Sequence, residues 1–111
     1  MHAETAVAAL AALAQEHRLA LFRLLVRAGE AGRPAGAIAA ELGVPNSSLS
    51  FHLSQLAKAG LICAERQSRS LVYRADYSAM NRLLGYLMEN CCAGGTCGEP
   101  AQASNQEREK A

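Results

Sequence analysis

Three of the four cysteines in this chain lie close together near its C-terminal end. Cys91 and Cys92 are adjacent, and Cys97 follows after Ala-Gly-Gly-Thr. No His, Asp or Glu stands between them, and Glu99 is the first candidate oxygen donor. Three thiolates without a fourth ligand suit a soft three-coordinate centre, whereas zinc usually takes four ligands. Trivalent arsenic or antimony, which carries a lone pair in place of a fourth ligand, fits such a set, so these cysteines form a candidate metal site.

The backbone must turn for the three sulfurs to converge. On a continuing helix, Cys91 and Cys92 would point about 100° apart and could not share one small ion. Asn90 and the Gly94-Gly95 pair favour a helix end at this point, because both residue types tolerate the left-handed conformation. The alternative is a set of incidental thiols in a polar tail. The fourth cysteine, Cys63, is expected to be a small buried hydrophobic residue and not a ligand.

Length and composition limit the kind of protein that could carry this site. The chain has 111 residues, of which 50% are hydrophobic and 19% charged, and its formal net charge is +1. These values fit one domain with its own core. The apolar run from Ala6 to Ala14 lacks the basic flank of a signal peptide, and no stretch approaches the ~20 apolar residues of a membrane span. We therefore expect a cytoplasmic protein with reduced thiols and no membrane partner.

Glycine, proline and hydrophobic periodicity predict four helices in the first 60 residues. The clearest stripe is Leu21, Leu24, Leu25 and Ala28, spaced at i, i+3, i+4 and i+7. Asn46 is the expected N-cap of the fourth helix, which Gly60 terminates. A short helix, a tight turn at Val44-Pro45 and a second amphipathic helix are typical of a helix-turn-helix. The predicted helices span residues 5–14, 16–28, 35–42 and 46–59.

The pattern after Gly60 changes to that of a hairpin followed by one more helix. Residues 61–66 and 71–75 are predicted strands joined by a polar turn, which places a wing after the helix-turn-helix. The fold class is therefore mainly α, or α+β: a winged helix-turn-helix with a two-stranded wing. Residues 77–90 are the predicted last helix. We divide the chain into a winged-helix domain over residues 1–92 and a cysteine-bearing loop with a polar tail over residues 93–111.

The second helix of the helix-turn-helix has a polar side opposite its leucine stripe. Short polar groups there could meet base edges or phosphates in a major groove, and an exposed Phe51 could lie against a thymine methyl. On the wing, Arg66, Arg69 and Arg74 could clamp phosphate or probe the minor groove. The alternative for both is an ordinary solvated surface. The candidate DNA-binding residues are Ser47, Ser48, Ser50, Phe51, His52, Gln55, Arg66 and Arg69.

The strings ALAQEHRLALFRLLVRAGEAG and AGAIAAELGVPNSSLSFHLSQLAKAGLI, followed by the arginine-bearing wing, resemble the ArsR/SmtB family of metal-responsive repressors. The resemblance covers about residues 8 to 90. It implies a homodimer that forms through the first and last helices and binds operator double-stranded DNA. It also implies repression of an operon that handles the sensed metal. The residues assigned to this interface are Leu10, Leu13, Met80, Leu83, Leu84 and Leu87.

Two metal-site patterns of that family are missing here. Residues 35–58 contain no cysteine, whereas the original arsenic sensors carry a Cys-x-Cys in the DNA-binding region. Residues 77–90 contain no Asp or His, whereas the zinc sensors carry a spaced Asp/His set on the last helix. What remains is similar to the arsenic-sensing branch with a C-terminal three-cysteine site. The resemblance thus implies As(III) or Sb(III) as inducer, bound by Cys91, Cys92 and Cys97, with no organic cofactor.

Other functions stay open at this point. The same DNA-binding module could sense cadmium, lead or mercury through these thiols, or respond to their oxidation. A thiol enzyme of arsenic metabolism is disfavoured, because Cys91 follows a helix C-terminus, where the dipole opposes a thiolate. A structural zinc module is disfavoured as well, since the predicted core does not need the tail. We therefore predict a non-enzymatic regulator.

Overall fold

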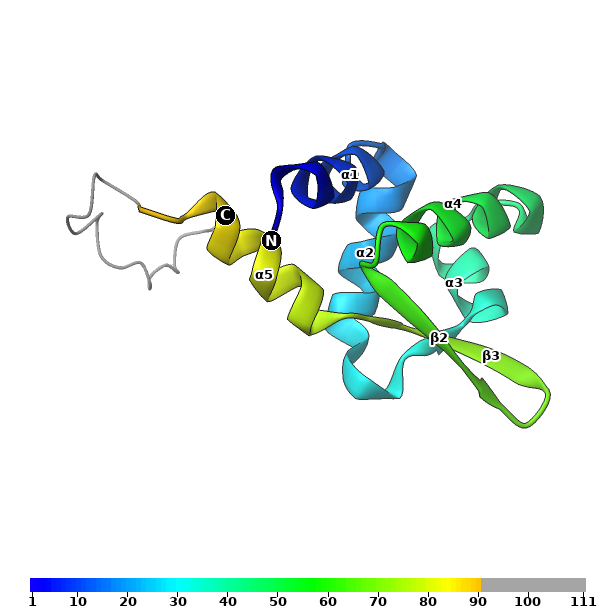
Figure 1. Ribbon diagram of the computed structural model, residues 1–111. Helices are drawn as coiled ribbons and strands as arrows, with labels where there is room; N and C mark the ends of the chain where they lie inside the picture. Colours follow the sequence, from blue (N-terminus) through cyan, green and yellow to red (C-terminus); the bar gives the residue numbers. More distant parts are fainter. Residues whose placement is uncertain (91–111) are drawn as a thin grey trace.

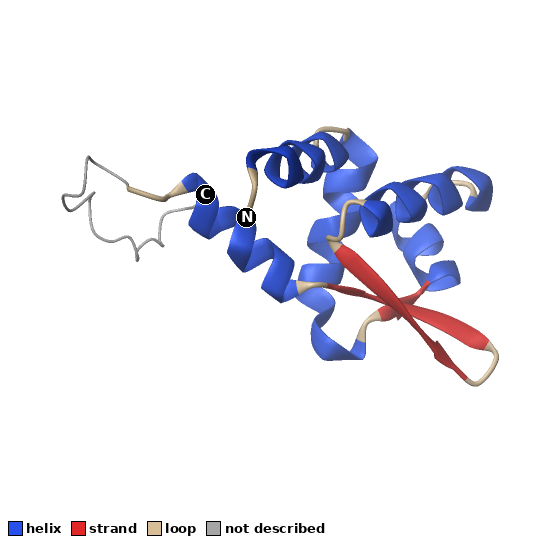
Figure 2. Cartoon of the chain, in the orientation of Figure 1, coloured by secondary structure: helices blue, strands red, loops and turns tan. Residues whose placement is uncertain are grey.

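The computed structural model describes residues 1–90, which form a helical body with a small sheet at one side (Figure 1). Figure 2 shows the two long strands extending beyond the helices, at the end of the molecule opposite α5. The elements in chain order are α1 (Ala3–Leu13), α2 (Glu16–Ala28), a 3₁₀ turn η1 (Gly29–Ala31), β1 (Arg33–Pro34), α3 (Ala35–Leu42), α4 (Asn46–Lys58), β2 (Ile62–Gln67), β3 (Ser70–Ala75) and α5 (Tyr77–Leu87).

The core gathers around α2. Leu21 and Leu25 of that helix are completely buried, and Leu24 is nearly so, which confirms most of the predicted stripe. Ala28 is only half-buried. The other large side chains that are essentially inaccessible come from the helix-turn-helix and the residue before β2, namely Ile38, Leu49, Leu56 and Leu61. The helix-turn-helix is thus fixed by its packing on α2.

The sheet has three strands, in the order β1-β3-β2, and all neighbours are antiparallel. Sequence patterning predicted β2 and β3 within one residue of their bounds, but predicted no strand at residues 33 and 34. β1 pairs Arg33 with Tyr73 and Pro34 with Val72. A Cβ on Gly32 would lie 2.5 Å from the Tyr73 carbonyl oxygen, so only glycine lets the chain pass this close to β3. β1 therefore attaches the base of the hairpin to the start of α3.

The hairpin of β2, β3 and the connecting Ser68-Arg69 is hereafter called the wing. Ser70 belongs to β3, so the connection is shorter than the four-residue turn that the sequence suggested. Ser68 takes the left-handed conformation with a φ of 56°, which lets two residues reverse the chain.

The last helix starts at a well-formed cap. The carboxylate of Asp76 accepts a hydrogen bond from the backbone N–H of Ala79 at 3.0 Å. The hydroxyl of Tyr77 donates to the carbonyl oxygen of Val26 at 2.8 Å, which fixes α5 to α2. The helix ends at Leu87, three residues earlier than predicted, and Asn90 has a φ of 56°. The predicted left-handed conformation at Asn90 is therefore present.

Within residues 1–90, no helix is long and apolar enough to cross a membrane.

Candidate nucleic-acid interface

The second helix of the helix-turn-helix, α4, presents its polar side to solvent; we call it the reading helix. Leu49, Leu53 and Leu56 hold its opposite side in the core, as the leucine spacing predicted. Phe51 is 57% exposed although it is aromatic, and its ring centroid lies 5.9 Å from that of His52. The serines among the candidates, Ser47, Ser48 and Ser50, are exposed as well. This surface has the short donors and the single apolar group that major-groove contacts require.

The start of the reading helix differs from the prediction. Asn46 is the first helical residue and not its cap; the cap position belongs to Pro45, with φ −64° and ψ 152°. The proline ring fixes φ, and its carbonyl oxygen accepts the first hydrogen bond of the helix from Leu49 N at 3.0 Å. No side chain caps this end. The exposed Asn46 side chain is therefore available on the outer surface, beside the serines.

His52 is a correction to the predicted DNA-binding set. Its side chain is only 9% exposed, and its Nδ1 lies 3.4 Å from Nη1 of Arg18. Burial is the main cause that lowers the pKa of His52, and the charges of Arg18 and His17 lower it further. Because a guanidinium can only donate, Nδ1 accepts, and the proton of the neutral ring lies on Nε2. His52 therefore joins the reading helix to α2 and is not positioned to read a base.

Gln55 also lies away from the centre of the polar surface. It is half-buried and lines a cavity between the reading helix and α1. Lys58, one turn further along the helix, is exposed and is not in the predicted set. Helical spacing already placed Lys58 within about 20° of Ser47, so the sequence contained the signal that it belongs to the polar side.

The wing provides two arginines for contact with a polyanion. Arg66 and Arg69 are exposed, as predicted. Arg74 is instead bound within the protein: its Nε donates to the Glu30 carbonyl oxygen at 2.6 Å, and it forms an ion pair with Glu65. The pairing of Glu65 with Arg74 joins the two strands of the wing. Arg74 thus stabilises the base of the wing, and the charge at its tip comes from Arg66 and Arg69.

A cleft of about 360 Å³ separates these two arginines from the start of α3. The first turn of α3 has no side-chain cap, so its backbone N–H groups point towards open space. An uncapped helix N-terminus beside arginines favours a phosphate oxygen. The residues that line the cleft are Pro34, Ala35, Gly36, Arg66, Arg69, Ser70, Leu71 and Tyr73. The cleft and the polar side of the reading helix together form a surface suited to a DNA backbone and its groove.

The six residues predicted to form a dimer interface divide into three groups. Leu10, Leu84 and Leu87 are exposed, and Leu13 and Met80 are half-buried. Leu83 is a correction, because it is 5% exposed and packs in the core of its own chain. The first and last helices lie side by side, with the N-terminus next to α5 (Figure 1). Val7 and Met88, which the sequence analysis did not single out, extend the exposed apolar surface of these two helices.

Of the four cysteines, the structure describes only Cys63. Cys91, Cys92 and Cys97 lie outside the described residues. Cys63 is exposed, so the prediction that it is buried is wrong. On β2 only Ile62 reaches the core, and from Cys63 onward the strand runs out into the wing. Within residues 1–90, no three His, Cys, Asp or Glu side chains come together as metal ligands.

This arrangement has close counterparts among known proteins. A helix-turn-helix domain family matches residues 13–62. The nodulation protein NolR of Rhizobium meliloti is 33% identical over 87 residues, covering 78% of this chain and 69% of NolR. The structure of an ArsR-like transcriptional regulator from Rhodococcus sp. RHA1 matches with a TM-score of 0.70 and 26% identity, covering 82% of each chain. The homodimeric winged helix-turn-helix DNA-binding domain of Mb0332 from Mycobacterium bovis, a possible ArsR-family regulator, matches with a TM-score of 0.64 and 25% identity over 77% of this chain and 83% of that one.

The fold and its exposed surface define a DNA-binding transcriptional regulator of the winged helix-turn-helix class. The chain belongs to the ArsR family of transcriptional regulators. The Rhodococcus relative is a transcriptional regulator and Mb0332 a possible one, which agrees with the predicted non-enzymatic function.

Proposed function

We propose that this ArsR-family protein is a homodimeric repressor that leaves its operator when trivalent arsenic or antimony binds Cys91, Cys92 and Cys97. The observation that carries the DNA-binding half of this proposal is the exposed polar side of the reading helix beside Arg66 and Arg69 of the wing. The observation that carries the inducer half is the spacing of the three cysteines. The two halves lie in different parts of the chain and can be tested apart.

On DNA, the reading helix would enter the major groove with Phe51 and its serines towards the base edges. The wing would follow the backbone, with Arg66 and Arg69 near phosphates or the minor groove. Phosphate contacts set the position of the protein on the duplex, whereas base contacts set its sequence preference. The reading helix therefore determines specificity, and the wing adds affinity that depends on salt.

The exposed apolar side chains of α1 and α5 support the homodimer. Leu10, Leu84 and Leu87 are each at least 42% exposed in the single chain, and a protein of this size does not gain from leaving them in water. The matching domain of Mb0332 is homodimeric. Two copies related by a two-fold axis would place their reading helices in successive major grooves, about one helical turn apart.

The inducer is assigned by the chemistry of its ligands. Thiolates select soft ions, and three of them leave no place for the fourth ligand that zinc usually takes. The described end of α5 is compatible with a site there, because the helix stops at Leu87 and Asn90 adopts a left-handed conformation directly before Cys91. The three thiolates would hold the ion, and the segment that carries them follows directly on the helix assigned to the dimer seam.

Binding near that seam would alter the distance between the two reading helices. A coupling of about 1–3 kcal/mol between inducer and DNA is typical of such allostery. A coupling in the upper part of that range lowers the affinity for DNA enough to release the protein from an operator that it only modestly saturates.

The test is fluorescence anisotropy of labelled operator DNA with the full-length protein. Arsenite, antimonite, zinc and cadmium are added in turn, and a thiol oxidant is added in a separate series. Release by arsenite and antimonite alone would support the proposal. Release by cadmium or by the oxidant, with none by arsenite, would replace the inducer while leaving the DNA-binding function in place. An absence of operator binding before any addition would contradict the DNA-binding half.

A further inference from the structure

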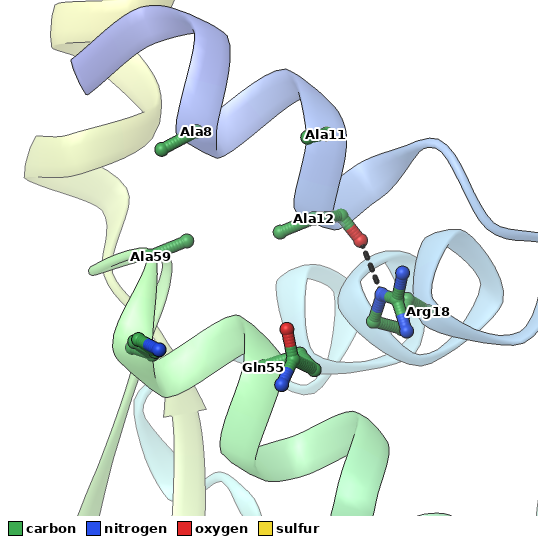
Figure 3. A pocket seen from close by; sticks show the side chains of 7 residues that line it. Ala8, Ala11, Ala12, Arg18, Gln55 and Ala59 are labelled. Atoms are coloured by element: carbon green, nitrogen blue, oxygen red, sulfur yellow. Dashed lines mark hydrogen bonds between the residues drawn. The ribbon is translucent and has the colours of Figure 1, made fainter. Parts of the chain in front are cut away.

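A cavity of about 410 Å³ lies between α1 and the C-terminal half of the reading helix, at the margin of the DNA-binding surface. Figure 3 shows it from close by, with α1 above, the reading helix below and the start of α2 at one end. Its volume falls within the range of small-molecule sites, which are about 300–1,000 Å³.

The apolar part of the cavity is lined by alanines. Ala8, Ala11 and Ala12 of α1 line one wall, and Ala59 lines the other beside the end of the reading helix. Larger side chains, such as Leu21 and Leu25 of α2, fill the core beside it. The methyl groups leave a gap with apolar sides, which can hold an apolar body about the size of a short acyl chain or an aromatic ring.

The polar end of the cavity carries an oriented guanidinium. Nε of Arg18 donates to the carbonyl oxygen of Ala12 at 2.7 Å, and its Nη1 lies 3.4 Å from Nδ1 of His52. These two contacts hold the planar group in one direction, with its remaining N–H groups unused within residues 1–90. A guanidinium fixed in this way loses little entropy when it binds a planar anion.

The lining of the cavity has positive charge and no acidic side chain. Lys58 lines the cavity together with Arg18, and the side chain of Gln55 points into it (Figure 3). The one ion pair among residues 1–90 joins Arg74 and Glu65, which are not part of this cavity. Two cations and an amide donor around a partly enclosed, apolar-walled space favour an anion that brings its own apolar surface.

We propose that this cavity binds a small organic anion: its carboxylate lies against Arg18 and Gln55, its apolar body lies on the alanines, and Lys58 adds positive charge to the wall. Such a ligand would contact α1 and the reading helix at the same time. If the proposed function holds, ligand and operator would therefore influence each other's affinity, because coupling between two sites is reciprocal. The site is distinct from the three cysteines and needs none of them.

The experiment titrates the full-length protein, without DNA, with acetate, hexanoate, benzoate and benzamide, and follows the backbone amide resonances by NMR. Hexanoate or benzoate should bind saturably, with the largest shifts at residues that line the cavity. Acetate has no apolar body, and benzamide is the uncharged counterpart of benzoate, so both should bind at least roughly tenfold more weakly. Saturable binding of neither hexanoate nor benzoate at about 10 mM would overturn the proposal, as would equal binding of benzoate and benzamide.

Two variants place the binding in the cavity. Ala11→Leu fills it from an exposed position, so the chain should fold normally and lose binding. Its matched control, Ala40→Leu, puts the same side chain at an exposed position on α3 and should bind like the parent. Lys58→Gln should weaken binding roughly tenfold, whereas Arg82→Gln, which removes a charge from α5, should not. Retained binding by Ala11→Leu would contradict this location.

Operator anisotropy with Ala11→Leu separates this proposal from the proposed function. Ala11 lies on neither the reading helix nor the wing, so the variant should keep operator affinity while it loses the carboxylate. Failure of the parent protein to bind operator would count against the proposed function only.

Discussion

The side chain of Arg18 links the end of α1 to His52 on the reading helix. The guanidinium reaches back to the Ala12 carbonyl oxygen and across to the His52 ring. A surface histidine would be available to DNA, but this ring is nine-tenths buried and already in contact with a cation. The type of a polar residue at the side of a helix therefore does not show whether it is free to bind a ligand or already contacts other residues of the same chain.

The buried ring makes stability depend on pH. Burial and the neighbouring charges lower the pKa of His52 from its ordinary value of 6.5, so the unfolded chain binds this proton more readily than the folded one. The stabilisation is complete above about pH 6.5 and is lost progressively as the pH falls below it. Urea unfolding should therefore show a lower midpoint at about pH 5.5 than at about pH 7.5.

His52→Gln identifies the source of that loss. The glutamine oxygen can still accept from Arg18, but the side chain does not titrate, so part of the pH dependence should disappear. His2→Gln, at an exposed position before α1, should keep the dependence of the parent. An unchanged pH dependence in His52→Gln would show that other groups cause it.

Arg69→Ala tests the wing at the level of one charge. Arg69 is exposed at the turn of the hairpin, so its loss should not affect folding. DNA binding should weaken on every sequence, and the slope of log K against log salt should become shallower by about one unit. Arg82→Ala removes the same charge from α5, away from the wing, and should leave the slope as it is. Equal slopes for parent and Arg69→Ala would mean that Arg69 does not contact phosphate.

At the scale of elements, periodicity and glycine placement predicted every α-helix of the described chain to within a few residues. These signals are local, so a single sequence contains them. The sequence did not predict β1, because this strand has only two residues, one of them proline, and is defined by its pairing with β3. Cys63 was predicted to be buried but is exposed, because β2 leaves the core after its first residue. No local sequence pattern shows at which residue a strand stops being covered by the rest of the protein.

The candidate site was predictable in outline and not in detail. The polar side of the reading helix follows from helical spacing, which holds for any helix packed through Leu49, Leu53 and Leu56. The roles of His52 and Arg74 depend on contacts with α2 and η1, which are distant in sequence. Which polar groups remain available for DNA is thus a property of the folded chain.

Phe51→Ala tests the reading helix as an element that selects sequence. The side chain is mostly exposed, so its removal should cost little folding free energy. Operator affinity should fall by about 1 kcal/mol or more, because an apolar contact with a thymine methyl is lost, and affinity for random DNA should hardly change. Competition binding with the two DNAs measures the ratio. Equal losses on both DNAs would remove Phe51 from the base-reading set.

At the scale of the whole molecule, Leu84→Glu should convert the dimer to monomers. Leu84 is 51% exposed on α5, so a carboxylate is tolerated in the single chain but would be buried without a partner in the proposed seam. Sedimentation velocity gives the oligomeric state, and operator affinity should fall with it. Leu71→Glu, at an exposed position of the wing, should remain dimeric. A dimeric Leu84→Glu protein would place the seam elsewhere.

Serine substitutions separate sensing from DNA binding. Cys91→Ser, Cys92→Ser and Cys97→Ser should each keep operator affinity, since the reading helix and wing lie within residues 46–75, but should lose most of the release by arsenite. A hydroxyl is a hard, protonated donor and a poor replacement for a thiolate on a soft ion. Cys63→Ser should respond like the parent. If Cys63→Ser alone lost its response to arsenite, the sensing thiols would have been misassigned.

The base of the wing is held at three points before any DNA arrives. β1 pairs with β3, Arg74 donates to the Glu30 carbonyl oxygen, and the same arginine pairs with Glu65 across the two strands. A wing that is already ordered gives up little conformational entropy on association, so more of the interaction energy of Arg66 and Arg69 remains as affinity. In the proposed function, the reading helix and the wing would meet the duplex as one preorganised body. In that function, the conformational adjustment that release from the operator requires would then fall to the seam between the two copies.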